Sequence, residues 1–412
     1  MKKDRSQRSN RISPEKDPIA PGLAPVSIGL TFAQTLNAKA YVTTLLVAAY
    51  DGQTVEAVDL AQLGAPLGVD VFEASAFVGQ ERLRSALLET GLRSRYDIKD
   101  MLPSGAIASR HVATGTNFAD HASETGGLKV FNFPKFGNPS PPLSTLVVNE
   151  GTLMDYEVEI SVRFDRDIRT MADFEAARKG FFLCGDFTDR ATLVRLVDRA
   201  NIASGKGFSD AKSGPDFFPT GPFLVIPHDW REFVSSERIV TRVNGHVKQD
   251  ARGQQMILDF EAIVEKALTN GGGGSYIYKG KPVPLLEKNT IERGSAVMSG
   301  TCAGVLFMPL LPEDKSGGMF DHITRLRFLR GEALVDSVVR RFIKNETKAK
   351  RYLQVGDQVE HLASTLGMLK VTLISPAPHL NPHGKVVSET KPVATDKAAL
   401  TAVHQGAARN GA

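Results

Sequence analysis

The stretch Leu153-Met-Asp-Tyr-Glu-Val-Glu-Ile160 places Glu157 and Glu159 two residues apart inside a β-type run. Side chains alternate between the two faces of a strand, so both carboxylates are predicted to project the same way, about 7 Å apart. Two like charges on one face repel each other unless a cation or hydrogen-bond donors lie between them. The stretch therefore predicts a strand that carries a pair of carboxylates on one face.

A third acid, Asp186, closes another apolar run, Gly180-Phe-Phe-Leu-Cys-Gly-Asp186. Three carboxylates without a Cys or His ligand suit a hard divalent ion such as Mg²⁺ or Mn²⁺, with water or substrate in the remaining positions. The alternative is a solvated strand face, because the Glu-x-Glu pattern is common in exposed strands. The spacing alone leaves both interpretations open.

Composition and charge exclude several classes of protein. The formal charge of +4 resides in residues 1–16, and the remaining chain is formally neutral, so the alkaline pI does not indicate a nucleic-acid-binding body. Only Cys184 and Cys302 are present, which excludes a disulfide scaffold and favours two buried free thiols. No signal peptide is visible, and the apolar run Ala40–Tyr50 is too short to span a bilayer. We therefore expect a cytoplasmic protein without a membrane or nucleic-acid partner.

Patterning along the 412 residues predicts a strand-rich α+β protein with an appended N-terminal α/β region. A helix is expected near residues 80–90, where apolar residues recur at helical spacing. The expected parts are a disordered basic tail (1–25), an accessory region (26–105), a catalytic domain (106–375) with an insertion at about 306–351, and a flexible C-terminal tail (376–412).

One part of the insertion, His322–Arg351, contains nine Lys or Arg residues against three acids, with apolar residues at helical spacing. This pattern predicts an amphipathic basic helix docked by one face. A positive rim would draw an anionic substrate, so we hypothesise that the helix lies near a pocket mouth or at a dimer interface beside it. The alternative is a solvated helix remote from the site.

Seven blocks follow one another in a fixed order. The first places His121 and Glu124 at positions i and i+3, on one face of a short helix. The blocks are Thr116-Asn-Phe-Ala-Asp-His-Ala-Ser-Glu124, Asp155-Tyr-Glu-Val-Glu159, Gly185-Asp-Phe-Thr-Asp-Arg190, Lys212-Ser-Gly-Pro-Asp-Phe-Phe-Pro-Thr-Gly-Pro222, Val243-Asn-Gly-His-Val-Lys-Gln-Asp250, Ser299-Gly-Thr-Cys-Ala-Gly-Val305 and Tyr352-Leu-Gln-Val-Gly-Asp-Gln-Val-Glu360.

This order resembles the fumarylacetoacetate hydrolase family, whose members tend to show N-Y-A-D-H-x-x-E, L-D-Y-E-x-E-L, N-D-x-S-x-R-D, a lysine before P-x-G-P, V-N-G-x-x-x-Q, T-G-T-P-x-G and a late x-G-D-x-V-E. The resemblance covers roughly residues 110–370. It implies a mixed β-sandwich roll around one Mg²⁺ or Mn²⁺ per subunit, usually in a homodimer. It also implies metal-dependent chemistry on 2-oxo or β-diketo acids.

The resemblance also implies a role for each matched residue. Glu157, Glu159 and Asp186 fall on the family's metal ligands, and His121 and Glu124 fall on its general-base dyad. Lys212 falls on the active-site lysine, whereas the residues expected to contact substrate are Arg190, Thr301 and Tyr156.

Some positions depart from the family pattern. Phe118 replaces the tyrosine of the first block, and Cys302 stands where proline is usual. Gly185 and Ala191 replace the Asn and the second Asp of the third block. These changes keep the metal ligands and alter the surroundings of the pocket. The identity of the substrate is therefore the property that the resemblance predicts least well.

The leading hypothesis is a divalent-metal-dependent hydrolase that cleaves a C–C bond in an acylpyruvate-like or fumarylacetoacetate-like β-diketo acid. A decarboxylase, isomerase or lyase acting on a 2-oxo acid is the enzymatic alternative, because the same site stabilises the same enolate. A family-fold binding protein is the alternative from another class. The intact acids, dyad and lysine argue against that last interpretation.

Overall fold

The computed structural model describes residues 18–103, 105–124, 129–271, 276–307, 312–324, 333–377, 379–380 and 386–387. One compact unit ends at Ile374, and a second begins at Ser375. Within the second unit, β20 (His379–Leu380) pairs with β21 (Val386–Val387). Residues 1–17 of the predicted basic tail, and the remainder of the predicted C-terminal tail, lie outside the described residues.

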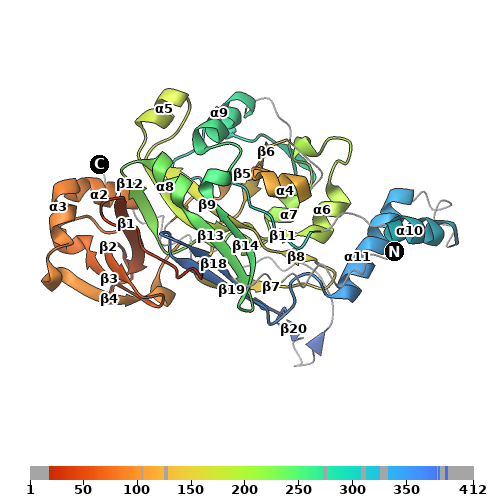
Figure 1. Cartoon of the computed structure of the whole chain (residues 1–412), viewed down its shortest axis with the longest axis horizontal. Helices are drawn as coiled ribbons and strands as arrows, with labels where there is room; N and C mark the ends of the chain where they lie inside the picture. Colours follow the sequence, from red (N-terminus) through yellow and green to blue (C-terminus); the bar gives the residue numbers. More distant parts are fainter. Residues whose placement is uncertain are drawn as a thin grey trace. The chain divides into compact units, whose positions relative to one another are not determined.

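The first unit contains a ten-stranded sheet with the strand order β4-β3-β2-β1-β12-β10-β9-β17-β5-β6 (Figure 1). Neighbouring strands run antiparallel except β17 and β5, which are parallel. The strands are β1 (Gly29–Leu36), β2 (Val42–Tyr50), β3 (Thr54–Asp59), β4 (Arg93–Asp97), β5 (Arg110–Gly115), β6 (Phe131–Phe136), β9 (Val158–Phe164), β10 (Lys179–Gly185), β12 (Leu224–Pro227) and β17 (Val297–Met298).

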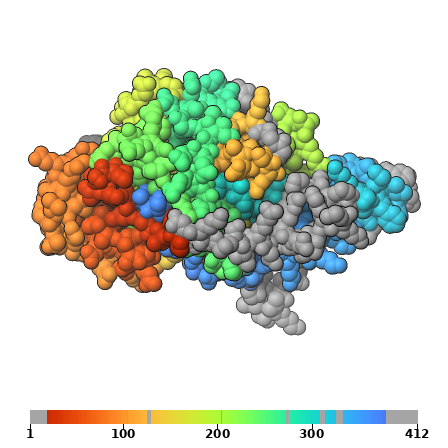
Figure 2. Space-filling view, in the orientation of Figure 1, coloured from red at the N-terminus to blue at the C-terminus, as the bar shows by residue number. Residues whose placement is uncertain are grey.

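The predicted accessory region extends this sheet. Strand β1 pairs antiparallel with β12, aligning Phe32 with Leu224, and both side chains are buried. Figure 2 shows the red-to-orange N-terminal segment in contact with the green segment that contains β12. The four N-terminal strands are therefore continuous with the sheet that carries β9 and β10.

A second, five-stranded sheet packs against the first, because β13 contacts β9 and β18 contacts β10. The face-to-face packing of the two sheets confirms the predicted strand-rich α+β class and its sandwich character. Its order is β14-β13-β18-β19-β7, with β7 (Leu143–Val147), β13 (Arg238–Val243), β14 (His246–Arg252), β18 (Gln358–Ala363) and β19 (Met368–Ile374).

Residues 18–25, which we expected to belong to the disordered tail, lie against this second sheet. Ile19 is buried beside Val240 and Leu362, and Leu23 forms an isolated bridge with Leu366. These apolar side chains gain partners more than 200 residues away in sequence, which local composition does not reveal.

Helices cover the ten-stranded sheet. Phe181 of β10 contacts Phe233 of α8 and Phe260 of α9, with ring centroids 5.6 Å apart in each pair. The helix predicted near residues 80–90 is confirmed but shorter, because it ends at Ala86. The helix predicted near residues 80–90 is α3 (Gln80–Ala86), and further helices of the first unit are α2 (Val71–Val78), α5 (Met171–Ala176), α8 (Trp230–Ser236) and α9 (Phe260–Asn270).

The described part of the insertion contains the helices α10 (Pro312–Thr324) and α11 (Leu334–Ala349). One face of α11 packs on α6 (Arg190–Leu196), where Phe342 belongs to the same buried cluster as Val194 (Figure 1). Docking of the predicted helix by one face is therefore confirmed for α11. Arg341 pairs with Asp321 of α10 at 3.5 Å. Assistance to an acidic substrate stays a prediction.

Among the described residues, no helix combines the length and the apolar character needed to cross a bilayer. The longest of them, α11, has 16 residues.

Acidification is expected to destabilise the fold below about pH 6.5. His111 is buried, with Nε2 3.0 Å from the Gly137 carbonyl, while Nδ1 accepts a hydrogen bond from Ala296 N. Burial lowers the pKa of His111 to about 4. The unfolded chain therefore binds the proton first, and stability that is complete above the unfolded pKa falls as the pH drops toward the folded one.

Urea denaturation as a function of pH measures this loss, which amounts to roughly 3 kcal/mol for His111. Replacing His111 with Gln should reduce the pH dependence of the free energy of unfolding in the range between these two pKa values. Replacing the exposed His246 with Gln is the matched control and should leave it unchanged. An unchanged slope in the His111 variant would contradict the assignment.

Candidate metal centre and active-site pocket

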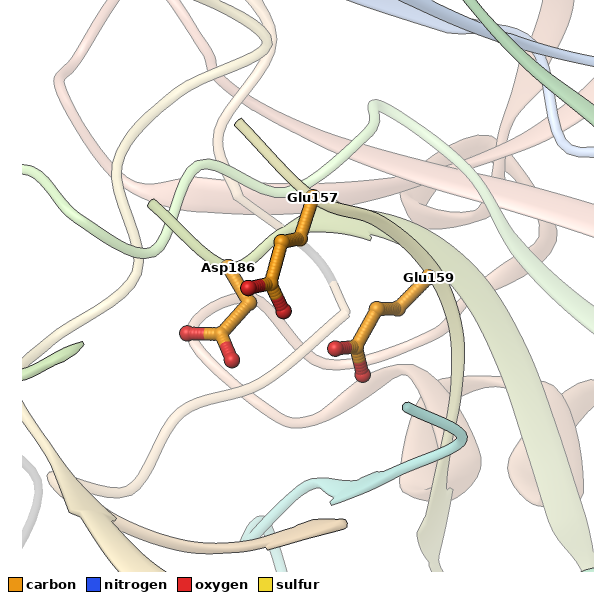
Figure 3. A group of neighbouring side chains, drawn as sticks. All are labelled: Glu157, Glu159 and Asp186. Carbon is orange, nitrogen blue, oxygen red and sulfur yellow. The ribbon is translucent and has the colours of Figure 1, made fainter. Parts of the chain in front are cut away.

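Paired strands bring the three predicted acids together. Strands β9 and β10 align Val158 with Gly185, and Asp186 N donates a 2.9 Å hydrogen bond to the Glu157 carbonyl. Each of the residues Glu157, Glu159 and Asp186 offers a carboxylate oxygen, and these oxygens lie within 4.8 Å of one another. Figure 3 shows the three side chains extending in the same direction from their strands. The predicted same-face pair is confirmed.

Three cationic side chains neutralise part of this buried acidic cluster. Lys212 Nζ lies 2.8 Å from Glu157 Oε2 and 2.7 Å from Asp186 Oδ2. Lys135 Nζ lies 2.7 Å from Asp186 Oδ1, and Arg190 Nη2 lies 2.6 Å from Glu157 Oε1. Buried carboxylates are tolerated only when paired in this way, because isolated buried charges lose their hydration.

The cations do not balance the acids. Asp155, which pairs with Arg190 Nε at 2.8 Å, is a fourth buried carboxyl group, so four acids face three cations. Glu159 accepts a 2.9 Å hydrogen bond from Gly300 N and forms no ion pair within the described part of the chain. Of these four carboxyl groups, Glu159 is the one without an ion pair in the part of the chain that the structure describes.

The pKa shifts follow from these contacts. Burial raises the pKa of Glu159 well above its usual range, and the charges of Asp186 and Glu157 raise it further. Burial also opposes ionisation of Glu157, but the nearby Lys212 and Arg190 outweigh it and hold the pKa of Glu157 at about 2. A divalent cation beside Glu159 would lower the pKa of this carboxyl group, because an added positive charge favours the ionised form.

Gly300 orients Glu159 through a backbone conformation that favours glycine. Its φ is +78°, and an added Cβ would lie 2.8 Å from the Thr114 carbonyl oxygen. We expect Gly300→Ala to weaken divalent-metal binding, because the shifted backbone moves the N–H away from Glu159. Calorimetric titration with Mn²⁺ measures this affinity. Gly245→Ala, at a positive-φ turn with open space around it, is the control and should retain wild-type affinity.

A pocket of about 130 Å³ adjoins the cluster. One part of its lining is polar and includes His121, Glu157, Arg190, Lys212 and Thr301. Thus the structure brings five of the predicted site residues to one cavity. The apolar part is formed by Phe131, Phe133, Leu193, Val194, Val197, Ile202, Phe208 and Phe307.

The predicted dyad lies on α4 (Ala119–Glu124), with His121 buried in the pocket lining and Glu124 exposed. His121 Nδ1 lies 3.4 Å from Glu124 Oε2. Gly304 N donates to the same carboxylate at 3.3 Å, which holds Glu124 in place. The pair therefore has the contact that a base and its orienting carboxylate require.

The remaining predicted substrate contacts are placed differently. Thr301 lines the pocket, and its hydroxyl donates to the Val158 carbonyl at 3.0 Å. Tyr156 is buried with its hydroxyl 3.0 Å from the Gly304 carbonyl, and it is not part of the pocket lining. Its predicted contact with substrate has no counterpart in this geometry.

Three residues at the centre were missed by sequence reasoning. Asp155 lies inside the motif that opens the sequence analysis, and its pairing with Arg190 joins residues 35 positions apart. Lys135 stands in the apolar run Phe131-Asn-Phe-Pro-Lys-Phe136, and a lysine in a buried strand is itself a signal of a buried acid. Thr188 accepts a 2.8 Å hydrogen bond from Lys212, and it stands where the third block of the family pattern has serine.

The donor set fits a hard divalent cation. Glu157, Glu159 and Asp186 supply oxygen ligands only, which Mg²⁺ and Mn²⁺ accept. An ion there would add positive charge beside Glu159, whose carboxylate forms no ion pair among the described residues.

The fold and this site define a strand-rich α+β protein with a buried carboxylate centre beside a pocket of about 130 Å³. The model of the family described as fumarylacetoacetate (FAA) hydrolase C-terminal matches residues 110–374, and the chain belongs to this family. The region before residue 110 lies outside that match.

Curated relatives match part of the chain. An uncharacterized protein of Staphylococcus epidermidis is 27% identical over 209 residues, covering 45% of this chain and 64% of that relative. A protein of Mycobacterium tuberculosis is 28% identical over 211 residues, covering 49% of this chain and 74% of the relative. The chain therefore spans less than two thirds of the Staphylococcus relative.

Solved structures share the fold. A probable 2-hydroxyhepta-2,4-diene-1,7-dioate isomerase from Mycobacterium abscessus superposes with a TM-score of 0.50 at 18% identity, covering 85% of this chain and all of that chain. A fumarylacetoacetate hydrolase from Exiguobacterium antarcticum has a TM-score of 0.48 at 17% identity, covering 84% of this chain and 100% of its own.

Proposed function

We propose that the protein is a divalent-metal-dependent hydrolase that cleaves a C–C bond of an acylpyruvate-like β-diketo acid. The observation that carries this proposal is the convergence of Glu157, Glu159 and Asp186 beside a pocket lined by His121 and Lys212. The site would hold Mg²⁺ or Mn²⁺ through the three carboxylates. When bound, such an ion supplies Lewis-acid polarisation and a template for the 2-oxo acid end of a substrate.

The reaction adds water across one C–C bond. Water attacks the distal carbonyl of the 1,3-diketone, and the bond between that carbonyl carbon and the methylene breaks. The electron pair passes to the pyruvate enolate, which then takes up a proton, so the products are a carboxylic acid and pyruvate. His121 is the residue proposed to accept the proton of the water, because it lines the pocket and contacts Glu124.

Lys212 is proposed to stabilise the negative charge of the enolate. Its ammonium group lies in the pocket lining, and its three N–H groups already donate to Glu157, Asp186 and Thr188. It therefore acts through its fixed positive charge in a buried site, where such a charge is effective. The proximity of Asp186 and Glu157 offsets the effect of burial and raises the pKa of Lys212, so it stays charged.

A decarboxylase or isomerase on a 2-oxo acid is the second candidate. The same carboxylate centre would stabilise the same enolate, and the hydrolase would differ from it only in the use of water and His121. The products therefore distinguish these reactions. A pair of organic acids indicates hydrolysis, and carbon dioxide indicates decarboxylation.

The test is incubation of the full chain with Mg²⁺ or Mn²⁺ and a panel of acylpyruvates and 2-oxo acids, followed by product analysis. Release of pyruvate with one equivalent of a second carboxylic acid supports the hydrolase. Carbon dioxide release or isomer formation without cleavage would replace it with the second candidate. Turnover that persists unchanged with an excess of chelator would contradict both.

A further inference from the structure

The apolar part of the pocket is continuous across several elements. Phe131 and Phe133 come from β6, Leu193 and Val194 from α6, and Phe208 from the start of α7 (Phe208–Lys212). The rings of Phe131 and Phe208 meet edge to face, with centroids 5.0 Å apart. Val197 and Ile202 also line this wall. Such a surface binds hydrocarbon and gives no hydrogen bond to a charged group.

Gly115 allows this wall to form. A Cβ at Gly115 would lie 2.5 Å from Cζ of Phe131, so any larger residue would displace the ring. The absence of a Cβ thus lets the far end of the Phe131 ring approach the backbone of β5.

Within the lining that the structure describes, the basic side chains other than His121 are already paired. Arg190 and Lys212 are the basic residues, apart from His121, in the described lining. The Arg190 guanidinium pairs with Asp155 and Glu157, and its face lies 5.2 Å from the centroid of the Phe307 ring. Lys212 uses its three donors on acceptors at the carboxylate centre.

From this division we infer that the substrate carries its acid group at one end only, and that the acyl group cleaved from it is apolar. The inference rests on the proposed function and narrows its substrate class: an acylpyruvate with an alkyl or aryl tail, rather than one ending in a carboxylate. Transfer of an ionised carboxylate to the phenylalanine and aliphatic wall would leave it without a partner.

The test compares acylpyruvates that differ only in the tail. In the series from acetylpyruvate to hexanoylpyruvate, kcat/KM should rise about fourfold for each added methylene until the wall is covered. Adipoylpyruvate, which has the same chain length but ends in a carboxylate, should be poorer than hexanoylpyruvate by on the order of 100-fold. Equal or better cleavage of adipoylpyruvate would overturn the inference.

Two variants at the C-terminal end of α6 test whether the preference for an apolar tail arises at this wall. Val197 lines the wall and is half-buried, whereas its neighbour Leu196 is 42% exposed. Val197→Arg should lower kcat/KM for hexanoylpyruvate and raise it for adipoylpyruvate, because a cation now faces the tail. Leu196→Arg adds the same charge toward solvent and should change neither value. The same response in both variants would overturn the assignment of this wall.

Uncleavable ligands separate this inference from the proposed reaction. N-hexyl oxamate and N-(5-carboxypentyl) oxamate share the 2-oxo acid-like end and differ in the tail, and calorimetry in the presence of Mg²⁺ measures their binding. Tighter binding of the hexyl compound supports the apolar wall even where no acylpyruvate is cleaved, a result that would reject only the reaction. Equal binding, or binding of neither compound, would overturn the inference.

Discussion

We expect His121→Ala to lower turnover of the preferred acylpyruvate by about 10²-fold or more, as is usual for loss of a general base. The imidazole lines the pocket, and its Nδ1 lies 3.4 Å from the Glu124 carboxylate. Metal affinity should remain near the wild-type value, because the three carboxylates of the centre are unchanged. Steady-state kinetics with saturating Mg²⁺, together with a metal titration, measure both quantities.

Two further variants test whether the loss of turnover is specific to His121. Glu124→Gln should show a smaller loss, since this carboxylate orients the base without taking part in attack. His246→Ala removes an exposed histidine on β14 and should retain full turnover. Ordinary turnover of the His121 variant at neutral pH would place the base elsewhere and reduce the His121–Glu124 pair to a helical contact.

A second large effect is expected on stability. Lys135 is fully buried on β6, pairs with Asp186 and donates to the Phe217 carbonyl at 3.3 Å. We expect Lys135→Met to lower the free energy of unfolding by roughly 3–5 kcal/mol, because removing one partner leaves a buried charge and carbonyls unsatisfied. Urea denaturation without metal measures this change.

Divalent metal should recover part of the lost stability. The variant centre has one positive charge fewer, so an added dication should raise the melting temperature more in Lys135→Met than in the wild type. Lys281→Met, at an exposed position of β16 (Lys281–Val283), is the control and should stay near wild-type stability. A Lys135 variant as stable as this control would contradict the structural role of the buried pair.

Local periodicity predicted only the same-face pair, and the family resemblance added Asp186 to it. Glu157 lies directly before β9 and Glu159 within it, and Asp186 follows the strand that pairs with β9. The strand-rich class followed from short apolar runs between Gly and Pro turns. The motif order assigned His121 and Lys212 to one active site, and both residues line the pocket.

Other features depend on contacts between distant residues. The sequence contains no sign that β1 pairs with β12, nor that Ile19 reaches the β13–β18 region. The apolar pocket wall joins Phe131 to Phe208 across more than 70 residues, so its composition appears only after folding. The domain boundaries, the homodimer and the cytoplasmic location stay predictions.

The central claim is that Glu157, Glu159 and Asp186 hold a divalent cation on which the reaction depends. The direct measurement is calorimetric titration of chelator-stripped protein with Mn²⁺ or Mg²⁺, followed by an activity assay on the same sample. We predict one ion per chain, recovery of activity with binding, and weaker binding by Glu159→Gln, which removes one of three neutralising charges. Full activity of the stripped protein, or metal binding unchanged in Glu159→Gln, would contradict the account.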